Sequence, residues 1–250
     1  MEPLLLLALT LAALGTAALS ATFGMAGGLL LMGVYTALLP VPEAMVLHGV
    51  TQLVANGGRA WLLRVHVRVD RLLFYAAGAL VAWALLRGAR WSPDRATVYL
   101  GIGAVPFVAL LLPATPALDF ARRRGAALCG LLVAGTQLAF GVAGPLLDVF
   151  FVRTALLRHQ VVATKATTQT LSHALKIAYF APLLVSDDTD VGGLGLAAGV
   201  SVLAAIVGTR LGGHLLDRLG EDTFRRWTRR LVLAIGAAYL AVGISLIVRG

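Results

Sequence analysis

Apolar residues form long runs along the chain, and short polar spacers separate them. Read with a window of about 20 residues, the length of helix that crosses a bilayer, the runs lie near 4–39, 43–63, 72–86, 96–112, 125–157, 160–183, 191–209 and 231–249. The spacers are rich in Arg, Pro and Gly, and none is long enough to fold alone. The pattern predicts an all-α integral membrane protein with about eight transmembrane segments.

A second pattern repeats at an offset of 117 positions. The sequence FGMAG at 23–27 returns as FGVAG at 140–144, and HGVTQ at 48–52 aligns without a gap on KATTQ at 165–169. Each copy thus carries a glycine break followed by a polar stripe. Internal duplication with breaks in corresponding places is typical of secondary transporters, whose binding site lies between the two halves.

We therefore expect two homologous transmembrane repeats, residues 1–117 and 118–250, which together form one transporter domain. The spacer at 187–190 is acidic, whereas the spacer at 210–230 carries six arginines. The positive-inside rule places the acidic spacer outside and the basic spacer in the cytoplasm.

Counting back from these spacers, both ends of the run at 125–157 lie inside, so we expect this run to enter and return as a hairpin turning at 141–145. The same reasoning makes 4–39 a hairpin. Three single crossings then follow in each copy, which forces the copies into opposite orientations. The basic spacer at 64–71 is the twin of the acidic one, as inverted repeats require, but the basic spacer at 87–95 disagrees. Inverted repeats with glycine-broken helices or hairpins are the prediction, and a plain eight-crossing arrangement is the alternative.

Composition supports a membrane protein, because 59% of residues are hydrophobic and 13% are charged, against roughly 25% charged residues in a soluble domain. The net charge of +9 does not indicate a nucleic-acid partner, since most arginines lie in the spacers. The partners expected are the lipid bilayer and a small ligand, and the apolar surface is compatible with any oligomeric state. The single Cys129 offers neither a disulfide nor a zinc site, and no cofactor is predicted.

The glycine breaks have two interpretations. A glycine inside a helix costs about 1 kcal/mol and a proline about 3 kcal/mol, so these residues need a reason to be there. Close packing of helices through small residues is one reason. The other is that the breaks free backbone N–H groups at membrane depth, which would attract an anion. The candidate binding residues in the breaks are Gly27, Gly28 and Gly144.

The polar stripes are a sharper signal. Four polar residues lie along one side of a helix in each copy. They are His48, Gln52, Asn56 and Arg59 in the first copy, and Lys165, Gln169, His173 and Lys176 in the second. A charged residue near the membrane interior costs on the order of 2.5–3.5 kcal/mol or more and usually faces a cavity. A cavity lined in this way is cationic and rich in hydrogen-bond donors.

Other polar residues have weaker cases. Thr51 and Thr168 sit one position off the stripes, where they could bind a ligand or bond back to their own helix. Arg59 and Lys176 are nearer the helix ends, where snorkelling to the surface is the favoured account. Asp148 is expected to form an ion pair with Arg153 or Lys165, and a role in carrying protons is the alternative.

These residues together resemble the sulfite exporter TauE/SafE family, also called the toluene-sulfonate uptake permease family. The resemblance rests on the breaks at 24–28 and 141–145, on the segment AMVLHG at 44–49, and on VATK at 162–165. It implies a multi-pass carrier in the cell inner (plasma) membrane that moves sulfite, an organosulfonate or a related oxyanion, with the proton-motive force as the energy source.

The predicted function is a secondary transporter, expected to be an exporter, of sulfite or a related small anionic substrate. Coupling to protons is left open. Lys165 would supply charge and Gln52 and Gln169 would orient the oxygens of the anion. His48 and His173 are candidates to couple protons, since imidazole titrates near neutral pH. The alternatives are a membrane enzyme and a non-transporting assembly factor. Neither an H-E-x-x-H nor a G-x-S-x-G motif is present, which argues against an enzyme.

Overall fold

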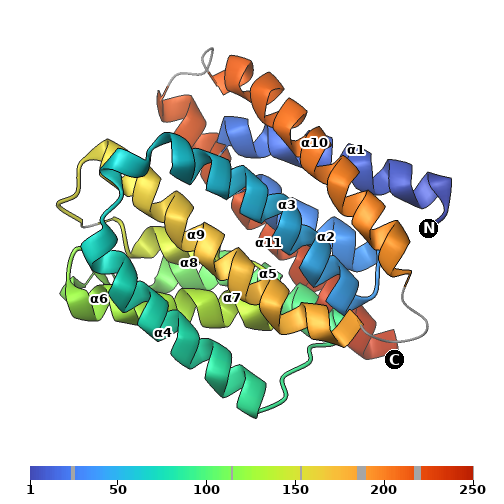
Figure 1. Ribbon diagram of the computed structural model, residues 1–250, viewed down its shortest axis with the longest axis horizontal. Coiled ribbons are helices and arrows are strands. Elements are labelled where there is room, and N and C mark those ends of the chain that lie inside the picture. Colours follow the sequence, from blue (N-terminus) through green and yellow to red (C-terminus); the bar gives the residue numbers. More distant parts are fainter. Residues whose placement is uncertain (24–25, 114, 153, 185–189, 217–220, 250) are drawn as a thin grey trace.

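The computed structural model of the protein describes residues 1–23, 26–113, 115–152, 154–184, 190–216 and 221–249. All regular structure in these ranges is helical, which confirms the predicted all-α class (Figure 1). The helices are α1 (Pro3–Phe23), α2 (Ala26–Leu38), α3 (Val41–Leu62), α4 (Val69–Gly88), α5 (Arg95–Leu111), α6 (Arg123–Cys129), α7 (Gly135–Phe140), α8 (Gly144–Val149), α9 (Arg158–Phe180), α10 (Val191–Leu216) and α11 (Glu221–Arg249). A π-helical segment, Gly130–Ala134, joins α6 to α7.

Within the described residues, four helices are long and apolar enough to cross a membrane. They contain the spans Pro3–Ala21, Val69–Gly88, Val191–Gly212 and Arg226–Arg249, in α1, α4, α10 and α11. Helices α2 and α5 are shorter but apolar. Large apolar side chains on the long helices are exposed, among them Leu7, Leu73, Leu203 and Ile247. Exposed apolar surface of this extent is what a lipid-facing wall requires.

Helices α3 and α9 carry the two polar stripes and lie side by side in the middle of the molecule (Figure 1). Near one end, a Cβ placed on Gly49 would be 2.8 Å from the Ile177 side chain, and further along, one placed on Gly57 would be 3.7 Å from the Thr170 side chain. The residue numbers rise on one helix as they fall on the other, so α3 and α9 are antiparallel.

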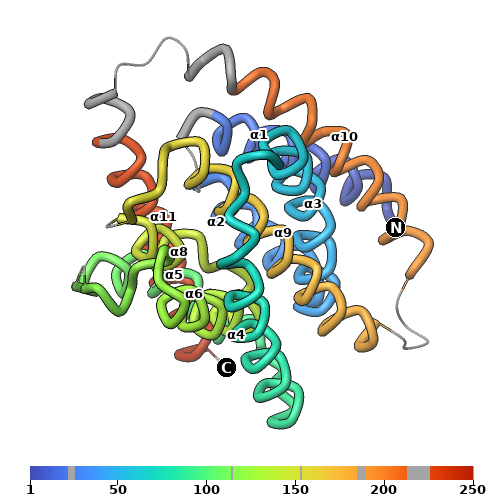
Figure 2. The backbone as a smooth tube through the Cα atoms, turned by 60° about the vertical axis from the view of Figure 1, so that its left-hand side comes forward, coloured from blue at the N-terminus to red at the C-terminus, as the bar shows by residue number. Residues whose placement is uncertain are grey.

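The helices that follow α3 and α9 in the chain each pack against a different part of the molecule. Helix α4, which follows α3, packs against α6 and the π-helical segment, whereas α10, which follows α9, packs against α1. Both contacts are close, because a Cβ added at Gly208 in α10 would clash with the Leu14 carbonyl oxygen, and one added at Gly130 would clash with the Tyr75 carbonyl oxygen. Helix α11 packs along α5, and Figure 2 shows the two together on the side away from α10.

The second glycine break separates α7 from α8. Helix α7 ends at Gly141, whose φ of 90° is a left-handed conformation that glycine adopts without strain. Pro145 lies in the first turn of α8, where its missing N–H costs nothing. The Phe120 amide donates to the Phe150 carbonyl oxygen at 2.9 Å, so the chain comes back beside its starting point. The structure thus has the return that the sequence predicted for 125–157.

The first glycine break falls partly outside the described residues, which omit Gly24 and Met25. On either side of it, α1 and α2 pack together. A Cβ on Gly27 would overlap the Thr16 carbonyl oxygen and the Ser20 side chain. Gly27 therefore allows two helix backbones to approach closely.

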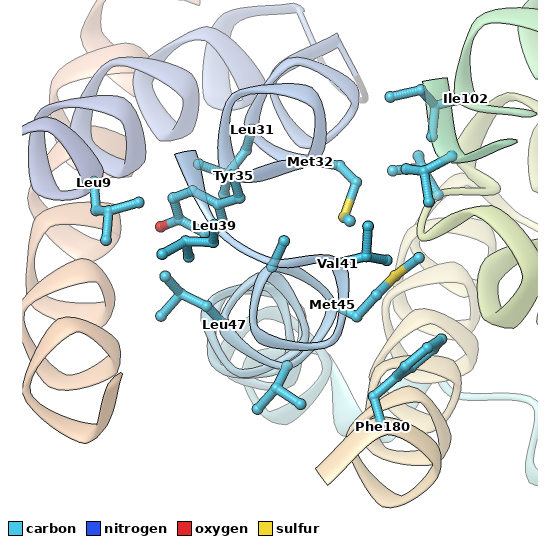
Figure 3. Packing of buried hydrophobic residues seen from close by; sticks show 14 of the residues in the cluster. Leu9, Leu31, Met32, Tyr35, Leu39, Val41, Met45, Leu47, Ile102 and Phe180 are labelled. Carbon is cyan, nitrogen blue, oxygen red and sulfur yellow. The ribbon is translucent and has the colours of Figure 1, made fainter. Parts of the chain in front are cut away.

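Two apolar clusters hold the central helices in place. Figure 3 shows the larger one, in which Met32 of α2 points toward Val41 and Met45 of α3, while Tyr35 of α2 points to the other side, toward Leu39. Ile102 of α5 and Phe180 of α9 belong to the same cluster. The second cluster surrounds α4 and the α6–α8 hairpin.

Candidate functional site

A cavity of about 240 Å³ is lined by α3 and α9, with further walls from α1, α2, α7, α8 and α10. Nine of the residues predicted to bind substrate or protons line it: Gly28, His48, Thr51, Gln52, Asn56, Gly144, Lys165, Gln169 and His173. The stripes converge because α3 and α9 pack against each other and each turns its polar side to the same cavity.

The cavity is basic. Arg59 and Lys165 line it, and the described lining residues include neither Asp nor Glu. Arg59 is exposed, which puts it near the rim of the cavity. Gln52 and Gln169 add amide donors from the two helices. The Asn56 side chain donates to the Gln52 carbonyl oxygen at 2.9 Å, so it is tied to its own helix.

Lys165 forms an ion pair with Asp148 of α8. This is one of the partners expected for Asp148 from the sequence. The side chain of Lys165 is 25% exposed and that of Asp148 is 38% exposed. The ammonium group therefore has a carboxylate partner while it also faces the cavity.

Lys176 does not reach the surface, and the snorkelling expected from its position is wrong. Its side chain is fully buried. Its Nζ donates to His48 Nδ1 at 2.7 Å and to the Gly141 carbonyl oxygen at 3.1 Å. The prediction used only the distance of Lys176 from the helix end, whereas α3, α4 and α7 pack against α9 in the structure.

The contacts of His48 define its tautomer. With Nδ1 accepting from Lys176, the ring proton is on Nε2, which donates to the Gly28 carbonyl oxygen at 3.0 Å. The ring centroid of His48 lies 5.5 Å from that of His173. The two imidazoles, one from each stripe, are therefore neighbours at the cavity wall.

Sequence reasoning missed Gln137. Its Nε2 donates to His173 Nδ1 at 2.8 Å, and the residue lines the cavity. A signal for it was present, because Gln137 lies 117 positions after Ser20, and Ser20 also lines the cavity. Both are polar residues in apolar hairpin arms. Thr16 and Thr209 are further lining residues that the stripes could not reveal.

Two predicted residues lie outside the cavity lining. Gly27 sits at the contact of α1 with α2, which favours the packing interpretation of that glycine. Thr168 is buried, and its hydroxyl donates to the Lys165 carbonyl oxygen at 2.9 Å. Thr51 lines the cavity, but its hydroxyl donates to the Leu47 carbonyl oxygen. Both threonines therefore adopt the back-bonded state.

In the part of the chain that the structure describes, no group of three or more His, Cys, Asp and Glu side chains is placed to hold a metal ion. The arrangement is instead a small basic cavity with amide and imidazole groups. These groups suit an anion held by charge and hydrogen bonds.

Comparison with known proteins identifies the family. Searches of curated proteins and of solved structures gave no significant match. A family model described as sulfite exporter TauE/SafE matches residues 9–239, nearly the whole chain. The match confirms the resemblance found in the sequence and makes the protein a multi-pass membrane transporter rather than an enzyme. The chain belongs to the sulfite exporter TauE/SafE family.

Proposed function

We propose that the protein is a secondary carrier that moves sulfite or a related small sulfur oxyanion across the cell inner membrane. The observation that carries this proposal is the cavity, where the polar stripes of α3 and α9 meet with two basic side chains and no acidic lining among the described residues. A cationic lining deep in an apolar molecule is costly unless a ligand uses it.

The size of the cavity supports a small substrate. Its volume of about 240 Å³ is below the roughly 300–1,000 Å³ typical of sites for drug-sized ligands. In our proposal Lys165 supplies the positive charge, and the amides of Gln52 and Gln169 donate to the oxygens of the anion. Gly28 and Gly144 let the anion approach the backbone, since neither has a side chain.

The helix arrangement supports inverted repeats. Helix α3, moved by the 117-position offset, would span 158–179, and α9 spans Arg158–Phe180. The two are antiparallel, as copies of opposite orientation must be. The same offset relates the contact of α10 with α1 to the contact of α4 with α6 and the π-helical segment. We infer that the repeats rock against each other to open the site to alternate sides.

His48 and His173 remain the imidazole candidates for proton coupling. Each has a ring nitrogen that accepts a hydrogen bond, from Lys176 and from Gln137. Protonation of either ring would have to break that bond, because both nitrogens of an imidazolium are donors. Sulfite itself exchanges a proton near neutral pH, so protons could also travel with the substrate.

The test is flux of labelled sulfite into liposomes that contain the purified protein, with sulfate and methanesulfonate as competitors and with or without a pH gradient. Saturable sulfite flux that Lys165→Ala abolishes in folded protein supports the proposal. Folded wild-type protein that moves none of these anions contradicts it, and a Gln169→Ala variant with full biological activity would point to an assembly factor.

A further inference from the structure

The ion pair between Asp148 and Lys165 joins the short helix α8 to the central helix α9. Lys165 lines the cavity, while Asp148 approaches it from α8. Asp148 lies four residues after Gly144, which itself lines the cavity. Both side chains are partly exposed, at 25% for Lys165 and 38% for Asp148, so water and solutes can reach the pair.

We propose that Asp148 is the proton-binding group of the carrier, and that it acts as an internal competitor of the substrate anion for Lys165. This inference rests on the proposed function, because it takes Lys165 as the group that binds the anion. In the structure the carboxylate of Asp148 holds the ammonium group of Lys165. An arriving anion meets a lysine whose charge is already neutralised.

Proton binding to Asp148 removes the competitor. A neutral carboxyl group no longer attracts the ammonium group strongly, and it does not repel an incoming anion. A bound anion, in turn, makes a second negative charge beside Lys165 unfavourable and promotes protonation of Asp148. The two binding events therefore favour each other, as reciprocal coupling requires.

The charge balance of the exchange is favourable. Before binding, Lys165 and Asp148 sum to zero. After one proton and one monovalent anion have bound, the ammonium group, the neutral carboxyl group and the anion again sum to zero. The site thus carries no added net charge in either state, and a low-dielectric surrounding penalises an unpaired charge. The proton comes from the aqueous side and stays on the Asp148 carboxyl group until the anion leaves.

Among the residues that the structure describes, the charged groups around α8 leave Asp148 as the acid of this site. Lys165 is the partner of Asp148 from α9, and the cavity adds Arg59, His48 and His173. Helix α5 and the π-helical segment pack against α8. Their titratable residues are Arg95 and Tyr99, which donate to the carbonyl oxygens of Leu39 and Gly33, away from Asp148.

The test compares two kinds of sulfite flux in proteoliposomes for the wild type and for Asp148→Asn. Exchange of external for internal sulfite needs no net movement of protons. Accumulation of sulfite against its own gradient, when external acid supplies the driving force, requires protons to move with it. We expect Asp148→Asn to keep exchange, with a KM lower by about two- to fivefold because Lys165 is freed from a partly exposed pair. We expect the same variant to lose acid-driven accumulation by tenfold or more.

Asp70→Asn is the matched control. Asp70 is also paired with arginine, at 3.0 Å from Arg68 and 3.3 Å from Arg71, but it lies outside the cavity lining. It should behave as the wild type in both assays. Should Asp148→Asn fail to fold, Asp148→Ser carries the same expectation.

Accumulation by Asp148→Asn at the wild-type level would overturn the inference and return the coupling role to His48, to His173 or to a proton carried by sulfite itself. A wild-type protein that exchanges sulfite but ignores the pH gradient would also overturn it, while leaving the proposed carrier function intact. A wild-type protein with no sulfite exchange would contradict the proposed function itself.

Discussion

Lys176 Nζ lies 2.7 Å from His48 Nδ1, and this contact links the two polar stripes across the centre of the molecule. The same ammonium group donates to the carbonyl oxygen of Gly141, at the break between α7 and α8. His48 in turn donates a hydrogen bond from Nε2 to the Gly28 carbonyl oxygen. One buried lysine thus ties together a residue of each stripe and the backbone near each glycine break.

The first prediction concerns this network. Lys176→Met removes the ammonium group that donates to the His48 ring and to the Gly141 carbonyl oxygen. Both acceptors then stay buried and lose this hydrogen bond. We expect the free energy of unfolding to fall by about 1–3 kcal/mol, measured as a lower Tm of the protein in detergent.

A double-mutant cycle with His48→Phe checks that the effect comes from the contact. Residues in one hydrogen-bond network couple by about 0.5–3 kcal/mol. His48→Phe should therefore cost less in the Lys176→Met protein than in the wild type. Additive losses would show that the two side chains act independently.

The second prediction concerns the amide of Gln169. We expect Gln169→Ala to raise the KM for sulfite by about 10- to 150-fold, because a hydrogen bond to a charged group contributes roughly 1.5–3 kcal/mol. Gln160→Ala is the control on the same helix. Its Oε1 accepts from the Leu157 amide at 3.1 Å, outside the cavity lining, so its KM should stay at the wild-type value. Equal KM values for the two variants would remove Gln169 from the site.

Much of the fold could be predicted from the sequence, because lipid imposes its pattern directly on the chain. The apolar runs located the helices, and the break at 141–145 appeared where glycine and proline interrupt a run. Helices α3 and α9 were also located, although their polar stripes keep them out of the clearly membrane-spanning helices. The packing of α4 against α6 and of α10 against α1 could not be predicted, because small residues permit close contact between helices without specifying the partner.

The sequence predicted those residues of the candidate site that recur at helical spacing along one side of a helix. Residues such as Gln52 and Gln169 fall on one side of a helix, and that side faces the cavity. Lys176 shares the spacing but turns to His48 instead, because α3 covers it. Gln137 was missed since it stands alone in an apolar run, and only its tertiary contact with His173 reveals it.

The third prediction concerns the packing of α10 on α1. A Cβ at Gly208 would overlap the Leu14 carbonyl oxygen and lie 3.1 Å from the Ala17 Cβ, whereas a Cβ at Gly199 would have no neighbour within 4 Å. We expect Gly208→Ala to lower the free energy of unfolding by about 1–3 kcal/mol through overpacking. Gly199→Ala on the same helix should raise it by up to about 1 kcal/mol, since alanine favours a helix. Thermal unfolding in detergent measures both, and a Gly208→Ala protein as stable as Gly199→Ala would contradict the close contact.

The last prediction concerns pH and the start of α5, outside the membrane-spanning segments. The Asp94 carboxylate accepts from the Thr97 amide at 2.7 Å and caps the helix. Hydrogen bonds from the Thr97 side chain and backbone lower the pKa of Asp94 below its ordinary value. A lowered pKa means that the ionised carboxylate stabilises the folded state above the unfolded value of about 3.9, and that this contribution is lost as the pH falls through the folded value.

We therefore expect Asp94→Ala to lower the free energy of unfolding by about 0.5–1 kcal/mol at pH 7, the lower part of the range for a cap, because Asp94 is exposed. The difference from the wild type should shrink as the pH falls below about 4, because the wild type then loses its ionised cap. Asp94→Asn, whose amide oxygen can still cap, should differ less from the wild type at pH 7. Melting temperatures recorded at pH 7, 5 and 3.5 measure the trend. A wild-type advantage over Asp94→Ala that grew in acid would mean that the carboxylate does not stabilise the helix in its ionised form.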